Sequence, residues 1–497
     1  MRQNSIVGGA LLLTVGAVLA KVFSAVYRII LTRILGGVGI GLYQLVFPVY
    51  SMCLVLSTTG IPIAVSKVIA KSEDVKFSIK YCFKFTIIIS IILACVLFAF
   101  SDILAKSQGD IRIAICFKLL APSIVIVGVS SVLKGYFQGM MNYIPSAVSQ
   151  VVEQFVKLVV GLLLSVFLID WGLIYSIVGA IIGIVVSEIV TMLILLMNFK
   201  KKGIKTSAKN TYTNKKQILK DILPITLTNL ILPISTFIDS ILVIKLLNIN
   251  FSSEISIYLY GLESGAVNNI VTLPTIFSFA VATAVMPSFS KENQDRTKFS
   301  KIFQLVILIT IPCFAIFVVA PEGILRILYS NTISSQGIDG LSISAELLRI
   351  GGFGMIFLAL NQIISSYLQA NDKRLSTIKN LIIGVMCKFL IEIIYLPYID
   401  INIYALAIAS TLCYLIVFVL NFLQVRKIQK ISFEKFFGMK IVVSSILMLL
   451  VYFVINSIGK SLFVSFFAYF IAGCSYFFSV YLLDIFPYKK SIFHQKS

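Results

Sequence analysis

Long apolar stretches follow one another along the whole of this 497-residue chain, and each reaches the roughly 20 residues that a membrane-spanning helix needs. The runs are continuous rather than alternating, which is typical of helices and not of the strands of a membrane barrel. With 59% hydrophobic and only 13% charged residues, the composition is far from that of a globular domain. The sequence therefore predicts an all-α polytopic membrane protein.

The connecting segments give the orientation. Alternate segments are rich in lysine and arginine, whereas the others are short and mixed or acidic. By the positive-inside rule, this predicts cytoplasmic N- and C-termini. The net charge of +21 fits loops that face anionic lipid rather than a nucleic acid. The predicted spans, about fourteen, cover residues 6–32, 40–66, 80–101, 112–133, 145–169, 173–198, 218–246, 260–286, 300–320, 344–370, 376–398, 402–424, 437–457 and 461–484.

Two short motifs recur at a similar offset and map each span onto the span six places later, which indicates two parallel repeats. The basic segment between them reads as a linker. We therefore expect two six-helix lobes followed by two additional helices. The motifs are Pro62 to Lys67 with Pro287 to Lys291, and Tyr136 to Gly139 with Tyr367 to Ala370; the expected domains are an N-lobe at 1–198, a cytoplasmic linker at 199–217, a C-lobe at 218–424, and two helices with a cytoplasmic tail at 425–497.

The first span carries Lys21 and Arg28, seven positions apart and so on one helical face. Arg33 follows before the Gly36-Gly37 break. A cation in hydrocarbon costs about 3 kcal/mol or more, so such residues usually face a bundle interior or a wet cavity. We expect this face to line a cationic cavity that binds substrate. The alternative is that Lys21 and Arg28 extend to the outer interface.

Two further charge pairs lie deep within predicted spans. Glu153 and Lys157, and Lys388 and Glu392, are each spaced i,i+4, so each can form an ion pair within one helix. They either fix helix packing or border a substrate cavity between the lobes, and the sequence does not choose between these roles. Glu263 is another charge within a span and a candidate for coupling to an ion.

Several classes of function are excluded. The chain has no GxxxxGK[ST] phosphate-binding loop, so ATP hydrolysis by that route is not expected. The single histidine, His494, lies in the tail, and the eight cysteines show no metal-ligand spacing. We expect a transporter without cofactor or metal, driven by an ion gradient or by consumption of the substrate, and not an enzyme.

Several motifs occur together along the chain: Gly41 to Lys67, Ser130 to Gly139, Ser149 to Gln154, Leu273-Pro274 and Met286 to Lys291. In combination they resemble the stage V sporulation protein B and MurJ-like group of flippases, within the multidrug/oligosaccharidyl-lipid/polysaccharide exporter superfamily, and imply a bacterial plasma membrane. That resemblance implies fourteen helices, alternating access and sugars on polyprenyl pyrophosphate as substrates. It also implies basic residues in the first span, where Lys21 and Arg33 match and Arg28 falls one place late. The family's arginine in the eighth span is absent: Asn268-Asn269 precede Pro274.

A pyrophosphate cannot cross hydrocarbon alone, and a cavity with Lys21 and Arg28 would receive it through charge-assisted bonds. We therefore expect a monomeric flippase for a lipid-linked saccharide, such as a cell-wall or spore-cortex precursor. The alternative is a multidrug or organic-cation antiporter of the same fold, whose site should be acidic. A third possibility is a membrane scaffold without transport activity, which would not need inward-facing charges.

Overall fold

The structure is a computed structural model that describes residues 6–58, 60–71, 75–202, 215–289, 296–330, 332–334, 337–429, 433, 435–459 and 461–485. Its regular elements are helices, as the apolar runs predict. The chain divides into two compact units, residues 1–261 and 262–497. Most of the predicted linker, residues 203–214, and the tail from residue 486 onward lie outside the described residues.

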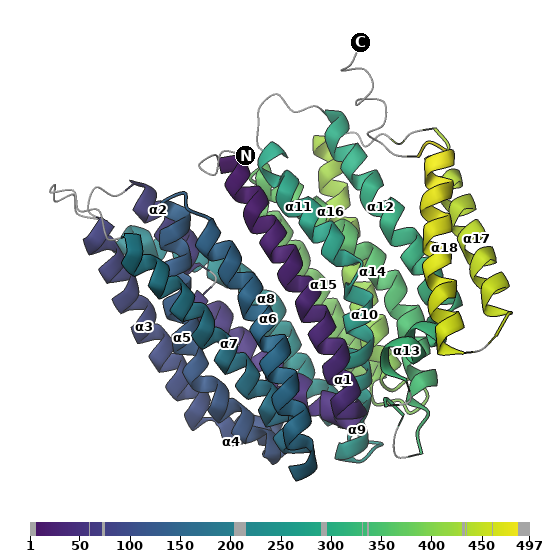
Figure 1. Cartoon of the computed structure of the whole chain (residues 1–497), viewed down its shortest axis with the longest axis horizontal. Helices are drawn as coiled ribbons and strands as arrows, with labels where there is room; N and C mark the ends of the chain where they lie inside the picture. Colours follow the sequence, from purple (N-terminus) through teal and green to yellow (C-terminus); the bar gives the residue numbers. More distant parts are fainter. Residues whose placement is uncertain are drawn as a thin grey trace. The chain divides into compact units, whose positions relative to one another are not determined.

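The N-terminal unit contains the helices drawn from purple to teal in Figure 1. Its central elements are α1, α5, α6 and α7, which pack on one another, and α8 and α9 pack against α1. The elements are α1 (Ile6–Thr58), α2 (Ile61–Lys71), α3 (Val75–Ala99), α4 (Ser101–Ser107), the 3₁₀ turn η1 (Ile111–Ile113), α5 (Ala114–Gly139), α6 (Ile144–Leu168), the 3₁₀ turn η2 (Ile169–Trp171), α7 (Leu173–Lys202), α8 (Lys215–Leu247) and α9 (Ser253–Tyr260).

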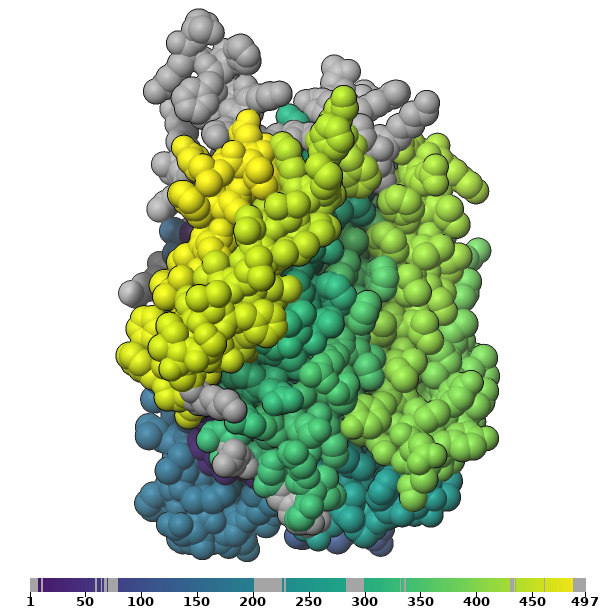
Figure 2. All heavy atoms as spheres, turned by 90° about the vertical axis from the view of Figure 1, so that its right-hand side faces the viewer, coloured from purple at the N-terminus to yellow at the C-terminus, as the bar shows by residue number. Residues whose placement is uncertain are grey.

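The C-terminal unit follows a π-helical turn at the boundary. Its helix α14 packs on α12, α11 and α16, while α17 and α18 form a pair that contacts α12 and α13. Figure 2 shows this pair side by side, in yellow and yellow-green, on one face of the unit. The elements are η3 (Gly261–Val267), α10 (Asn268–Thr272), α11 (Thr275–Phe289), α12 (Arg296–Val319), α13 (Pro321–Tyr329), α14 (Gly340–Ala370), α15 (Arg374–Tyr395), α16 (Tyr404–Ile428), α17 (Phe437–Asn456) and α18 (Leu462–Leu482).

Among the described residues, eleven helices are long and apolar enough to cross a membrane, or twelve when the bent pair Ser253–Thr272 and Thr275–Ala282 counts as one span. Helix α1 is 53 residues long and is broken in the middle, so it supplies two spans. Helix α15 has 22 residues but carries Lys379, Lys388 and Glu392. With α1 counted twice and α15 included, the structure is consistent with the fourteen spans predicted from the sequence.

The break in α1 is at Gly36, where φ is 66° and ψ is −174°. A positive φ of this kind is open to glycine and costly for other residues. In a straight helix, Arg28 and Phe47 would be about 28 Å apart, at 1.5 Å per residue. Instead, the Arg28 guanidinium carbon lies 5.5 Å from the centre of the Phe47 ring. Gly36 therefore folds the second half of α1 back beside the first half.

Glycines let α6 and α7 approach each other closely. A Cβ atom placed on Gly183 would lie 2.2 Å from Cα of Gly161, and one on Gly179 would lie 2.6 Å from the carbonyl oxygen of Leu164. Backbone contact of this kind is the usual role of small residues at four-residue spacing in membrane helices. It fixes the register in which the charged residues of α6 and α7 meet.

Amide side chains join three helices inside the C-terminal unit. Asn380 of α15 donates to Asn421 of α16 at 2.8 Å, and Asn421 donates to Asn361 of α14 at 3.4 Å. Asn361 in turn donates to the carbonyl oxygen of Tyr414 at 3.0 Å. Because all three side chains are buried, these bonds replace those that water would otherwise supply.

The α6–α7 contact predicts a large effect of Gly183→Ala. The new methyl group has backbone rather than side chain against it, so the helices must separate, at a cost of about 1–3 kcal/mol. The matched control is Gly473→Ala in α18, where nothing lies within 4 Å of the added Cβ; alanine's higher helix propensity should make it neutral or slightly stabilising. Thermal unfolding in detergent should show a clear fall in Tm for the first variant alone. Equal Tm values for both variants would contradict this account of the packing.

Candidate substrate-binding site

Two cations from different helices lie against one aromatic ring in the N-terminal unit. The guanidinium carbon of Arg28 is 5.5 Å from the centre of the Phe47 ring, and Nζ of Lys157 is 5.3 Å from the same centre. Nζ of Lys157 also lies 5.0 Å from the centre of the Tyr27 ring. Ring faces attract cations by about 0.5–2 kcal/mol. Arg28 and Lys157 carry like charges that act on each other, so an anion between them would be favoured.

The position of Lys157 makes its charge costly. It lies near the middle of α6, and its side chain is buried, with the residue 7% exposed. A charged side chain at the centre of a spanning helix costs about 3 kcal/mol. Within the described ranges no carboxylate forms an ion pair with Lys157, and its ammonium group lies against the rings of Tyr27 and Phe47. Its N–H donors are therefore available to a ligand.

The fold explains how Tyr27 reaches Lys157. A Cβ atom on Gly161, one turn after Lys157 in α6, would lie 3.1 Å from the Tyr27 ring and 3.3 Å from its hydroxyl group. The absence of a side chain at Gly161 leaves room for this ring, which is fully buried. The same glycine contacts α7, so one residue sets both the helix crossing and the position of the aromatic ring beside the ammonium.

An acidic group of residues lies close to the two cations. Glu153 of α6 forms an ion pair with Lys134 of α5 at 3.4 Å and accepts a hydrogen bond from Gln154 at 3.0 Å. Glu188 of α7 is 7% exposed, and the charges of Glu153, Lys134 and Lys157 act on it. One of its carboxylate oxygens, Oε2, has no hydrogen-bond partner among the described residues. Arg28, Lys157, Lys134, Glu153 and Glu188 together form what we call the N-unit charge cluster.

The structure corrects two expectations for these residues. The i,i+4 pair of Glu153 and Lys157 is wrong as an ion pair, because Glu153 is bonded to Lys134 and Lys157 faces the rings of Tyr27 and Phe47. Lys134 falls between the predicted spans 112–133 and 145–169, but it lies within α5, with its side chain 17% exposed. A carboxylate on the neighbouring helix compensates its charge there, which allows α5 to continue past it.

The predicted residues of the first span are placed differently from one another. Arg28 and Lys21 are half-buried, and Arg33 is exposed. Of the three, the structure brings Arg28 together with Lys157, because both lie against the Phe47 ring. Sequence reasoning missed Tyr27 and Phe47 as contacts of the cations. Nothing in the local sequence signals these contacts, because they depend on the fold of α1 and on the α6–α7 crossing.

Three predicted site residues belong to the C-terminal unit. Lys388 and Glu392 form the expected i,i+4 ion pair in α15, at 3.4 Å, and Glu392 is fully buried. Glu263 lies in the π-helical turn η3 and is half-buried. A π-helical turn inside a spanning segment frequently marks a functional position. Next to it, the carbonyl oxygen of Ala266 accepts a hydrogen bond from the hydroxyl group of Tyr329 at 2.9 Å.

Comparison with known proteins identifies the chain. The family of polysaccharide biosynthesis proteins matches residues 6–291, which is more than half of the sequence. The chain belongs to this family. All five residues of the N-unit charge cluster lie within the region that the family matches.

Relatives within and around this polysaccharide biosynthesis family extend the likeness. The chain is 25% identical over 311 residues to stage V sporulation protein B of Bacillus subtilis (strain 168), a match that spans 60% of each protein. In fold, it matches a structure of the lipid II flippase MurJ in an inward closed conformation, with a TM-score of 0.73, 15% identity, and coverage of 97% of this chain and 99% of the other. An inward-facing MATE multidrug transporter gives a TM-score of 0.62 at 17% identity, with coverage of 82% and 94%.

The Lys134–Glu153 ion pair predicts measurable coupling. Both side chains are less than one-fifth exposed, so Lys134→Met and Glu153→Gln should each destabilise the protein. A double-mutant cycle should give a coupling energy of about 1–2 kcal/mol. The exposed pair Lys118–Asp102, at 2.9 Å, is the control and should give less than about 1 kcal/mol. Unfolding free energies in detergent provide the measurement; equal coupling for the two pairs would count against a buried pair in α5 and α6.

Proposed function

We propose that this protein is a flippase that moves a polyprenyl-pyrophosphate-linked saccharide, such as lipid II or a related peptidoglycan or spore-cortex precursor, across the membrane by alternating access. The observation that carries the proposal is the placement of Arg28 and Lys157 against one ring inside the apolar bundle. The names of two similar proteins, a stage V sporulation protein and a lipid II flippase, support the substrate class.

The chemistry of the cluster suits a pyrophosphate. Arginine presents a planar fork of N–H donors and lysine presents three, and charge-assisted bonds from such groups are worth about 1.5–3 kcal/mol each. Bringing a dianion between two mutually repelling cations relieves their repulsion as well as forming these bonds. Lys21, seven residues before Arg28, is proposed to extend this cationic face. Arg33 is proposed to bind substrate at the end of the first span.

The roles of the remaining predicted residues follow the same scheme. Glu153 is proposed to orient Lys134 through their ion pair and to border the substrate site. In the other unit, Lys388, Glu392 and Glu263 are proposed to contact the saccharide or a coupling ion. The moving lobes are proposed to be residues 1–198 and 218–424, joined by residues 199–217, with residues 425–497 attached to the second lobe and the protein acting as a monomer.

Transport measurements in vesicles test the site. In vesicles with labelled lipid II, the double variant Lys21→Ala/Arg28→Ala and the single variant Lys157→Met should each slow translocation at least tenfold, because each removes a charge-assisted contact worth more than about 1.4 kcal/mol. The control is Arg426→Gln, an exposed arginine in the last turn of α16, and its rate should equal that of the wild type. Unchanged translocation in both site variants would remove this site assignment.

One observation favours a second candidate, an organic-cation antiporter. The buried carboxylate of Glu188 has an oxygen without a hydrogen-bond partner in the described ranges, and such a group attracts a cation. The fold match to a MATE transporter agrees with this possibility. The two candidates are separated by Glu188→Gln: loss of cation efflux with normal lipid II translocation would favour the antiporter, and the opposite result would favour the flippase.

The proposed orientation, with both termini in the cytoplasm, has its own test. Alkaline phosphatase fused after Gly109, in the segment between α4 and η1, should be active, since this segment belongs to the set with little positive charge. The same enzyme fused within residues 203–214 should be inactive, whereas a fluorescent protein fused there should fluoresce. Reversed activities would show that the N-terminus faces outward.

A further inference from the structure

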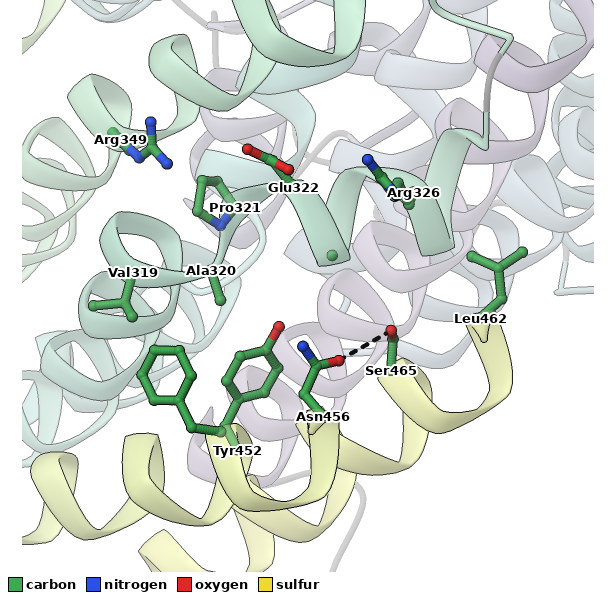
Figure 3. A pocket seen from close by; sticks show the side chains of 12 residues that line it. Val319, Ala320, Pro321, Glu322, Arg326, Arg349, Tyr452, Asn456, Leu462 and Ser465 are labelled. Atoms are coloured by element: carbon green, nitrogen blue, oxygen red, sulfur yellow. Dashed lines mark hydrogen bonds between the residues drawn. The ribbon is translucent and has the colours of Figure 1, made fainter. Parts of the chain in front are cut away.

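A polar pocket lies in the C-terminal unit, apart from every residue considered above. Its volume is about 370 Å³, within the range of roughly 300–1,000 Å³ that is typical of small-molecule sites. Figure 3 shows α13 and α14 on one side and the pair α17 and α18 on the other. Its polar lining residues are Glu322, Arg326, Arg349, Tyr452, Asn456 and Ser465.

The walls of this pocket are fixed by bonds to the end of α12. Nε of Arg349 donates to the carbonyl oxygen of Val318 at 3.2 Å. The hydroxyl group of Tyr469 donates to the carbonyl oxygen of Ala320 at 2.7 Å. Val318 belongs to the last turn of α12, where carbonyl groups lack partners within the helix, and Ala320 directly follows that helix. A Cβ on Gly323 would lie 2.3 Å from the Tyr469 hydroxyl group, so a side chain at this position would displace the hydroxyl group.

The charges in the pocket form a dipole. Arg349 is balanced by an ion pair with Glu346. This leaves Arg326 and Glu322, which lie one turn apart on α13, are both exposed, and form no ion pair with each other among the described residues. A net-neutral pocket with separated positive and negative groups complements a ligand that carries both charges rather than one.

The location of the pocket indicates an amphiphile. It lies where α12 and α17 end and where α13 and α18 begin. Because the ends of spanning helices lie near the membrane–water interface, we infer that the pocket opens there. The helix α13 buries Leu325 and Tyr329 and exposes its charged face, as an interfacial helix does. At the rim of the pocket, Phe453 and Leu462 are 52% and 55% exposed, and apolar side chains of this kind suit an acyl chain.

We propose that this pocket binds the head group of a zwitterionic phospholipid, with the phosphate on Arg326 and Arg349 and a primary ammonium on Glu322. Arg349 has five N–H donors, of which Nε and Nη1 are used by Val318 and Glu346, so others remain for a phosphate oxygen. Asn456, which accepts a hydrogen bond from Ser465 at 3.3 Å, faces the ester oxygens. A purely anionic head group would meet the carboxylate of Glu322 without compensation.

Native mass spectrometry of the delipidated full chain tests the proposal and is independent of flipping. Phosphatidylethanolamine should bind with one high-affinity equivalent and a Kd at least tenfold lower than that of phosphatidylglycerol. Arg326→Gln and Glu322→Gln should each weaken this binding at least tenfold. Phosphatidylcholine has a quaternary ammonium without an N–H group, so Glu322→Gln should also reduce the ratio of its Kd to that of phosphatidylethanolamine. Because both residues are exposed, the variants should keep the wild-type Tm.

The control variant is Arg112→Gln, which removes an arginine paired with Asp110 outside the pocket and should leave lipid binding unchanged. Equal affinity for all three lipids, unaffected by the pocket variants, would show annular lipid only and would overturn the proposal. Tighter binding of phosphatidylglycerol than of phosphatidylethanolamine would overturn it as well, since the pocket would then select a net negative head group.

Discussion

The ammonium group of Lys157, held inside an apolar bundle by ring faces, depends on more of the structure than any other group described here. Its position requires the Tyr27 ring, which requires Gly161 to have no side chain. It also requires the Phe47 ring, which reaches it only because α1 folds back at Gly36. Hydrocarbon offers no water to such a charge, so the surrounding helices must supply its stabilisation. The cost of keeping this cation among apolar helices is the reason why we propose that an anion binds beside it.

The general architecture could be predicted from the sequence because the membrane leaves few choices. Continuous apolar runs must become helices, and the Gly36-Gly37 pair marked the break that the structure places at Gly36. The ion pair of Lys388 with Glu392 was also predictable, since i,i+4 residues on one helix are neighbours whatever the rest of the fold does.

The contacts that define the candidate site were not predictable in the same way, because they join distant parts of the chain. Glu153 bonds to Lys134 rather than to Lys157, and this choice depends on how α5 and α6 pack. Arg28 lies beside Phe47 only after α1 has reversed direction. The pocket lined by Arg326 and Glu322 depends on where α12 ends and on the tyrosine that bonds to that end. Local sequence patterns therefore predict helix boundaries and ion pairs within one helix, whereas the packing of distant segments determines which charged side chains come into contact.

The asparagine chain of the C-terminal unit contrasts with the charges of the N-terminal unit. Asn380, Asn421 and Asn361 link three helices through neutral amides: Asn380 donates, while Asn421 and Asn361 each donate and accept. Neither acid nor base changes the charge of these groups, and dissolved ions do not screen them. The adhesion of α14, α15 and α16 is thus insulated from the proton and salt gradients across a living membrane, so this part of the bundle keeps its shape while conditions on either side differ.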